Sequence, residues 1–211
     1  MTKVAFLDVD GTLTHGKSSW EKVHHHFGVQ RDMKEHSKRY FAGELTYEEW
    51  AKLDVSLWKG HSIQDLDIAL NPPDLIEGAA QGVKKIKDAG FYVVLLSGGI
   101  DVMVNEVARI VGADEAHANV IGHTNGILDG TVGVTVGIKS RVINQLQATR
   151  GYDLSQSVAV GDNFNDIDMF KLVGKSVAVN PKSEELTEVA DSVIRTDNFV
   201  EVADHLLHLV G

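Results

Sequence analysis

Two aspartates, separated by one residue, close a short apolar segment near the N-terminus: Val4-Ala5-Phe6-Leu7-Asp8-Val9-Asp10. Side chains two residues apart on a strand point the same way, so both carboxylates would leave one sheet edge together. Like charges this close are costly unless a metal ion or a shared proton compensates them. The pair predicts Asp8 as a nucleophile and Mg²⁺ ligand and Asp10 as a nearby acid or base; the alternative is a solvated turn.

Three further segments put polar groups at the end of an apolar run or at the start of a helix. Ser97-Gly98-Gly99 offers a hydroxyl and backbone N–H groups that suit a phosphate, although a plain strand-to-helix turn has the same composition. Lys139 opens a helix, where a cation is unfavourable unless an anion lies beside it; a solvated surface lysine is the alternative. Asp162 and Asp166 supply the carboxylate oxygens that Mg²⁺ selects, or else they cap a helix.

Short runs rich in Val, Ile and Ala alternate with helical stretches along most of the chain, which is typical of parallel strands in an α/β sheet. Strands are expected at Val4–Asp8, Tyr92–Ser97, Ala118–Ile121, Ser157–Gly161, Ser176–Val179 and Ser192–Ile194. Helices are expected at Gly78–Ala89, Asp101–Val111, Lys139–Thr149, Asn165–Leu172, Lys182–Val189 and Val200–Leu209. Ligands of open parallel sheets bind at the carboxyl ends of the strands, so the polar groups would meet there.

The stretch from about Ser18 to Leu70 interrupts this alternation, because it has no strand candidate and its apolar residues follow helical spacing. It also contains all three tryptophans, Trp20, Trp50 and Trp58, which are expected to pack its interior. Asn71-Pro72-Pro73 marks its end, since prolines terminate helices. We therefore predict a helical cap over residues 15–71, inserted into an α/β core made of residues 1–14 and 72–211.

A small antiparallel hairpin is expected within the core, over residues 120–138. Asn125-Gly126 and Asp129-Gly130 are both strong tight-turn signals, and β-forming residues flank them. His24-His25-His26 invites a metal assignment, but consecutive helical side chains point roughly 100° apart and do not converge on one ion. We expect an exposed helix face at these histidines instead.

In their order and placement the four motifs resemble those of the haloacid dehalogenase superfamily of phosphatases, and within it the phosphoserine phosphatase-like branch. The resemblance covers nearly the whole chain, including a helical insertion directly after the first motif. It implies a Rossmann-like parallel core with a helical cap. It also implies an Mg²⁺-dependent phosphomonoester hydrolase that works through an aspartyl-phosphate.

The resemblance further implies a role for each motif residue. Asp8 attacks phosphorus, while Asp10 protonates the leaving alkoxide and later deprotonates the hydrolytic water. Mg²⁺ is held by the Asp8 carboxylate, the Asp10 carbonyl and Asp162, with Asp166 supporting its waters. The phosphoryl oxygens are held by Ser97, the Gly98 N–H and Lys139, and Asn165 lines the site. Dehalogenases of the superfamily lack an acid at the position of Asp10, so dehalogenation is disfavoured.

Two positions depart from the branch, which recognises the serine amine with a glutamate nine residues after the nucleophile and the serine carboxylate with a cap arginine. Lys17 and Asp54 occupy these positions here, so both charges are inverted. Three interpretations stay open: a different small phosphomonoester, which we prefer; a Lys17–Asp54 pair; or phosphoserine bound with its two groups exchanged. Phe41 and Tyr47 are candidates to face the substrate, with core packing as the alternative.

Parts of the sequence also fit other classes of protein. Residues 11–18 satisfy the P-loop pattern G-x-x-x-x-G-K-[ST] between a strand and a helix, which predicts an ATPase or kinase. However, Asp8 and Asp10 would then face nucleotide phosphates, and Ser97, Lys139 and Asp162 would have no role. A receiver-like signalling protein would be shorter and would have no helical lid. A phosphotransferase would use the same residues as a hydrolase.

The overall composition agrees with an enzyme of small metabolites. The 211 residues carry a net charge of -10, which opposes binding to nucleic acid and anionic membranes. A small phosphorylated metabolite is the expected partner, and the oligomeric state stays open. The absence of cysteine excludes disulfides and thiol catalysis. No apolar run reaches a membrane-spanning length, so we expect a soluble, cytoplasmic protein.

Overall fold

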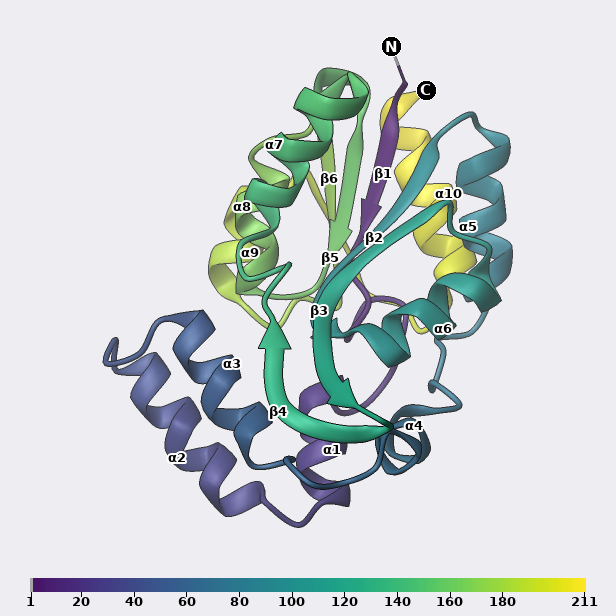
Figure 1. Ribbon diagram of the computed structural model, residues 1–211. Coiled ribbons are helices and arrows are strands. Elements are labelled where there is room, and N and C mark those ends of the chain that lie inside the picture. The colour runs from purple at the N-terminus through teal and green to yellow at the C-terminus, as the bar shows by residue number, and fades with distance from the viewer. Residues whose placement is uncertain (1) are drawn as a thin grey trace.

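The computed structural model describes residues 2–211 as a seven-stranded sheet between two layers of helices, with four more helices beyond the carboxyl ends of the core strands (Figure 1). The strand order is β4-β3-β2-β1-β5-β6-β7, and every neighbouring pair is parallel except β3 and β4. The strands are β1 (Val4–Leu7), β2 (Tyr92–Ile100), β3 (Glu115–Thr124), β4 (Ile127–Gly133), β5 (Val158–Gly161), β6 (Lys175–Val179) and β7 (Ser192–Ile194). The predicted α/β class with a parallel core is confirmed.

The helices fall into two groups. The first group follows β1 and comprises α1 (Ser19–His26), α2 (Gln30–Phe41), α3 (Tyr47–Ser56) and α4 (Ile63–Leu70). The second group covers the sheet and comprises α5 (Ala79–Asp88), α6 (Asp101–Val111), α7 (Lys139–Arg150), α8 (Ile167–Phe170), α9 (Glu184–Val189) and α10 (Phe199–Val210). Within the described part of the chain, no helix combines the length and hydropathy needed to cross a bilayer.

Alternation along β1 divides the core into two apolar layers. Ala5 and Leu7 belong to the layer under α5, α6 and α10, whereas Val4 and Phe6 belong to the layer under α7, α8 and α9. All four side chains are fully buried. Since burying a large apolar side chain contributes about 1.5–3 kcal/mol, the two layers hold the strand ends in fixed positions.

Residues 19–70 form the helical segment that the sequence predicts as a cap. Three of its helices start at reciprocal capping boxes, which join Ser18 to Glu21, Thr46 to Glu49 and Ser62 to Asp65. Trp58 is fully buried, and its ring centroid lies 5.4 Å from that of Trp20. The ring of Trp50 stacks on Tyr40, with centroids 4.5 Å apart. The division of the chain into cap and core at residues 14 and 72 stays a prediction.

β3 and β4 form an antiparallel hairpin whose turn is Asn125-Gly126, with φ of 52° and 78°. Asp129-Gly130 does not form a second turn; it lies within β4, where Gly130 has φ of 84°. The hairpin also contacts the helical segment, because the Gly60 N–H donates to the Leu128 carbonyl at 2.9 Å and the Leu128 N–H donates to the His61 carbonyl at 2.8 Å. These bonds tie residues 60–63 to the sheet.

Two predicted elements differ from those observed. β2 extends to Ile100 and not only to Ser97, so Gly98-Gly99 lies inside the strand instead of after it, with a shift of the pairing register to β3 between Leu96 and Ile100. The helix expected over Asn165–Leu172 is a 3₁₀ turn at Phe164–Asp166 followed by the short α8. Both differences occur at the polar motifs, where the backbone departs from a regular strand or helix and positions the side chains of these motifs.

Candidate active site

The carboxyl ends of β1 and β5 bring the first and fourth motifs together. β1 pairs with β5 in parallel register, with Leu7 opposite Val160. Asp8 follows Leu7 by one residue and Asp162 follows Val160 by two, so both aspartates lie just beyond this pair. The Asp8 N–H donates to the Val160 carbonyl at 2.9 Å, which continues the pairing to the aspartate itself. Both side chains are almost fully buried.

Lys139, the first residue of α7, bridges two aspartates. Its Nζ lies 2.5 Å from Asp8 Oδ1 and 2.5 Å from Asp166 Oδ1, and all three residues are buried. The second oxygen of Asp166 accepts hydrogen bonds from the backbone N–H groups of Asp162 and Asn163 at 2.9 and 3.0 Å. The two carboxylates therefore provide the anions that the placement of a lysine at a helix start requires.

Burial changes the proton affinity of these groups. It raises the pKa of Asp8 and of Asp166, although the ammonium of Lys139 opposes the rise in both. Burial lowers the pKa of Lys139, but the charges of Asp166 and Asp8 outweigh it and the net shift is upward. Lys139 is therefore a permanent cation in the site, suited to binding a phosphoryl oxygen.

Asp8, Asp162 and Asp166 also form a group with metal-ligand geometry. Each offers a carboxylate oxygen, and the three oxygens lie within 4.8 Å of one another. Gly11 keeps space beside this group, because a Cβ at that position would lie 2.2 Å from Asp162 Oδ2. Buried carboxylates clustered in this way fit a hard divalent cation such as Mg²⁺, whose charge would offset theirs.

Asp10 points away from that group and toward the helical segment. Its Oδ2 accepts a hydrogen bond from Ser19 Oγ at 2.8 Å, and both of its oxygens accept from the Ser19 N–H at 3.2 Å. Burial raises the pKa of Asp10, while the bonds from Ser19 work against the rise. A carboxyl group with a raised pKa has the properties of a candidate general acid.

Ser97 and Gly98 lie near the carboxyl end of β2. Ser97 is buried, and its Oγ accepts a hydrogen bond from the Gly99 N–H at 3.0 Å. Gly99 approaches the acid closely, since a Cβ there would lie 2.6 Å from Asp10 Oδ2. Tyr47, from α3, donates its hydroxyl to the Gly98 carbonyl at 2.9 Å, so the helical segment reaches the phosphate-binding candidates.

Phe41 and Asn165 lie at the rim of the site. Phe41 is 67% exposed at the end of α2, and its ring lies 6.2 Å from that of Phe164, which is 45% exposed. This is a contact between the helical segment and the loop after β5. Asn165 is exposed in the same loop, directly before Asp166. Core packing, the alternative for Phe41, is excluded by its exposure.

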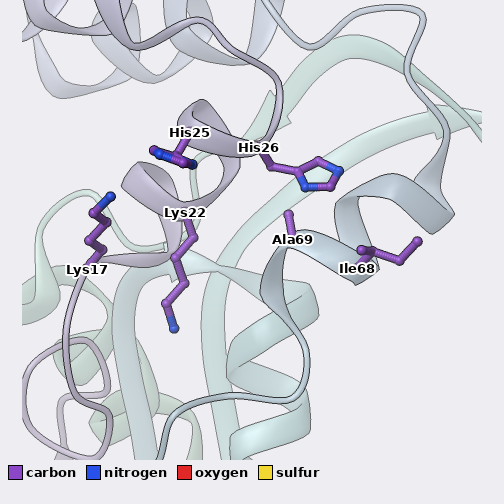
Figure 2. A pocket seen from close by; sticks show the side chains of 6 residues that line it. All are labelled: Lys17, Lys22, His25, His26, Ile68 and Ala69. Carbon is purple, nitrogen blue, oxygen red and sulfur yellow. The ribbon is translucent and has the colours of Figure 1, made fainter.

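Lys17 and Asp54 do not pair with each other, so that interpretation is wrong. Asp54 is buried, and its carboxylate lies 2.6 Å from His36 Nδ1 and 3.5 Å from His24 Nε2. Lys17 is exposed and lines a hollow of about 260 Å³ between α1 and α4 (Figure 2). Figure 2 shows Lys17, Lys22 and His25 around this hollow. The cations that meet the site aspartates are Lys139 and Lys182 and not Lys17, which argues against the P-loop alternative.

The expectation that all three consecutive histidines are exposed is also wrong for one of them. His24 is fully buried, and its Nδ1 lies 2.6 Å from the Trp20 carbonyl, whereas His25 and His26 are exposed. The reason is that α1 packs with one side on Trp58, whose ring lies 5.1 Å from that of His24. Trp58 therefore covers His24 and leaves His25 and His26 exposed.

Three residues of the site were not singled out from the sequence. Lys182 Nζ lies 2.7 Å from Asp162 Oδ2, Thr12 Oγ1 donates to Asp8 Oδ2 at 3.2 Å, and Ser19 binds Asp10. The place of Lys182 just after β6, a strand next to β5, was an available signal. Ser19 lies nine residues from its partner, and no local pattern marks it.

Comparisons with known proteins agree with this arrangement. Residues 5–171 match the family model for haloacid dehalogenase-like hydrolases. The phosphoserine phosphatase of Methanocaldococcus jannaschii is 31% identical over 207 residues, which cover 97% of each chain. The phosphoserine phosphatase of Wolinella succinogenes is 29% identical, covering 97% of this chain and 100% of the relative.

Solved structures give the same result. A phospho-aspartyl intermediate analogue of phosphoserine phosphatase matches with a TM-score of 0.83 and 30% identity, covering 97% of this chain and 98% of the other. A substrate-bound phosphoserine phosphatase complex matches with a TM-score of 0.81 and 29% identity over the same shares of the two chains. This chain belongs to the haloacid dehalogenase-like hydrolase family. It is a phosphatase of the phosphoserine phosphatase-like branch, and the resemblance seen in its motifs is confirmed.

Proposed function

We propose that this phosphatase hydrolyses a small phosphomonoester other than L-phosphoserine, through an aspartyl-phosphate on Asp8. The observation that carries the proposal is the buried bridge from Asp8 through Lys139 to Asp166, with each contact at 2.5 Å. It gives the nucleophile a fixed position and a permanent neighbouring cation. Phosphoryl transfer needs mainly this positioning and charge neutralisation from a protein.

In the first step a carboxylate oxygen of Asp8 forms a bond to phosphorus, and the bond from phosphorus to the leaving oxygen breaks. Asp10 donates its proton to that oxygen, in keeping with its raised pKa. In the second step Asp10 accepts a proton from water as the water oxygen bonds to phosphorus, and the bond to Asp8 breaks. Ser97, the Gly98 N–H and Lys139 hold the phosphoryl oxygens throughout.

Asp8, Asp162 and the Asp10 carbonyl would hold Mg²⁺, with Asp166 binding its waters. The close grouping of the three carboxylates, all buried, supports this ligand set. Bound there, Mg²⁺ supplies positive charge to the phosphoryl oxygens. Lys182, on Asp162 Oδ2, keeps one carboxylate neutralised from the outer side.

The substrate proposal rests on the two inverted positions. Asp54 is already engaged by His36, and Lys17 lines the hollow between α1 and α4. Position 17 offers no acceptor for the substrate ammonium, and position 54 offers no cation for the substrate carboxylate. A phosphomonoester without an amino-acid head group fits these residues better than phosphoserine does.

A panel of phosphorylated metabolites, including L-phosphoserine, tests the proposal at saturating Mg²⁺ by measuring phosphate release. We expect L-phosphoserine not to be the best substrate, because its two head groups meet no complementary charge. Asp8→Asn should abolish turnover while the protein stays folded, since it removes the nucleophile and Lys139 keeps its ion pair with Asp166. Turnover retained by Asp8→Asn would refute the nucleophile, and a kcat/KM for L-phosphoserine far above all others would refute the substrate class.

A further inference from the structure

The carbonyl of Gly98 accepts hydrogen bonds from three side chains. Trp20 Nε1 of α1 donates at 2.8 Å, the Tyr47 hydroxyl of α3 at 2.9 Å and Asn119 Nδ2 of β3 at 2.8 Å. Since a carbonyl oxygen has two lone pairs, it is fully occupied by this set. Two of the donors belong to the helical segment and one to the sheet, so the three meet only while that segment lies against the strand ends.

Asn119 organises this group of donors. It is fully buried, and its Nδ2 also lies 2.9 Å from the Tyr47 hydroxyl oxygen, to which it donates. Its Oδ1 accepts from the Val136 N–H at 3.0 Å. Asn119 is thus held on both sides, and it orients the Tyr47 hydroxyl proton toward Gly98. Burial raises the pKa of Tyr47 to about 12, which keeps the hydroxyl a donor.

The other end of the same peptide plane contacts the phosphate-binding candidate. The Gly98 carbonyl and the Gly99 N–H belong to one peptide group, and the Gly99 N–H donates to Ser97 Oγ at 3.0 Å. Because this bond uses a lone pair of Ser97 Oγ, it leaves the hydroxyl proton free for another acceptor. A phosphoryl oxygen bound over β2 is such an acceptor.

We propose that Trp20 and Tyr47 are positioning residues that set the Ser97 hydroxyl through the Gly98–Gly99 peptide when the helical segment closes. Closing supplies two donors to the Gly98 carbonyl, and these fix the peptide plane. The fixed Gly99 N–H then directs the Ser97 proton toward the phosphoryl group. The proposal rests on the proposed function, in which Ser97 binds a phosphoryl oxygen.

A second contact of α1 acts in the same direction. Ser19 Oγ donates to Asp10 Oδ2 at 2.8 Å and accepts from the Ile100 N–H at 3.2 Å, one peptide beyond Gly99. Movement of α1 away from the sheet would therefore release the general acid and the phosphate-binding hydroxyl together. This arrangement confines the aligned site to the closed, water-excluding state.

Tyr47→Phe tests the inference, because it removes one donor and keeps the ring. With p-nitrophenyl phosphate at saturating Mg²⁺, we expect kcat to fall about fivefold, as for the loss of one hydrogen bond, with KM nearly unchanged. Trp20→Phe with Tyr47→Phe should lower kcat about thirtyfold. Tyr40→Phe is the matched control, since the Tyr40 ring stacks on Trp50 within the helical segment, and it should keep the parental kcat.

A double-mutant cycle with Ser97→Ala gives a readout that a merely structural role would not change. Single-turnover formation of the aspartyl-phosphate is measured in each variant. We expect the effect of Tyr47→Phe to fall below about twofold once the Ser97 hydroxyl is absent. An equal effect in both backgrounds, or no effect in the parent, would overturn the inference. If Tyr47→Phe lowers the melting temperature, the same cycle is run with Trp20→Phe.

The cycle also separates this inference from the proposed function. A parent protein that forms no aspartyl-phosphate, or an Asp8→Asn variant that still turns over, would refute the function itself. A parent that forms the aspartyl-phosphate, combined with independent effects at positions 47 and 97, would leave the function intact and refute the positioning role.

Discussion

Lys139 illustrates how a residue that is unremarkable in the sequence acquires chemical meaning from its neighbours. A lone lysine is ordinarily a solvated surface group, yet this one is buried between Asp8 and Asp166. A charge removed from water in this way is stable only when it is paired, and removing one partner of a buried pair is strongly destabilising. Its position one residue into α7 makes the pairing obligatory, because the helix dipole disfavours a cation there.

His24 gives a prediction at the same scale, for stability against pH. Its pKa is lowered by burial to about 4 from the ordinary 6.5, so the unfolded chain takes up a proton that the folded chain refuses. The contribution of His24 to the free energy of unfolding therefore falls as the pH drops from 6.5 toward 4. Over pH 7 to 5 this loss is about 2 kcal/mol. In urea unfolding, the free energy of unfolding of His24→Asn relative to that of the parent should therefore rise by about 2 kcal/mol from pH 7 to pH 5.

His25→Asn serves as the matched control for this measurement. His25 is the exposed neighbour on the same helix, so its replacement should leave the parental pH profile unchanged. Parallel profiles for the parent and His24→Asn would contradict the assignment of His24 as a buried neutral imidazole.

Among the elements, helix α7 begins without a side-chain cap from its own N-terminal residues. Ile138, the residue before the helix, provides no side-chain cap, and Asp168 of α8 accepts the Ser140 N–H at 2.7 Å instead. A carboxylate from another helix thus performs the capping that Ser, Thr or Asp usually performs locally. Because Lys139 is the first residue of α7, this contact also helps to hold the lysine at the site.

Asp168→Ala should therefore lower both stability and activity. We expect the free energy of unfolding in urea to fall by about 1 kcal/mol, as for the loss of a helix cap, and kcat to fall with it. Asp168→Asn keeps an acceptor oxygen and should recover most of both losses. Asp88→Ala removes only an exposed pair with Lys84. It should change the free energy of unfolding by no more than about 0.5 kcal/mol and leave kcat at the parental value. Equal effects of Asp168→Ala and Asp88→Ala would exclude the capping role.

For the whole molecule, the net charge of -10 matters less than where a few of its charges lie. Asp8, Asp162 and Asp166 gather at one sheet edge, and Lys139 and Lys182 contact them from two sides. An acidic protein can bind a phosphate there if a cation reverses the local sign. The helical segment covers the same edge (Figure 1), so the charges act in a poorly hydrated space.

Metal removal tests this arrangement in the intact protein. EDTA should abolish phosphate release and excess Mg²⁺ should restore it, whereas Ca²⁺ should support it poorly, because Ca²⁺ is larger and takes more ligands. Mg²⁺ should also raise the melting temperature by binding the folded state. Asp162→Asn, which removes a carboxylate charge from the group, should weaken that rise. Full activity in EDTA would contradict the metal assignment.

The sequence by itself determined the class of fold and indicated the main candidate site residues, because both follow from local order. Apolar runs ending in Asp8, Ser97 and Asp162 place chemistry at strand ends, and parallel strands share one edge. The tertiary structure alone decided which side chains meet across that edge. The engagement of Asp54 by His36, the pairing of Lys182 with Asp162, and the bonds of Trp20 and Tyr47 to Gly98 join distant segments. The spacing of residues along the sequence does not predict such contacts, because they depend on how the helices pack on the sheet.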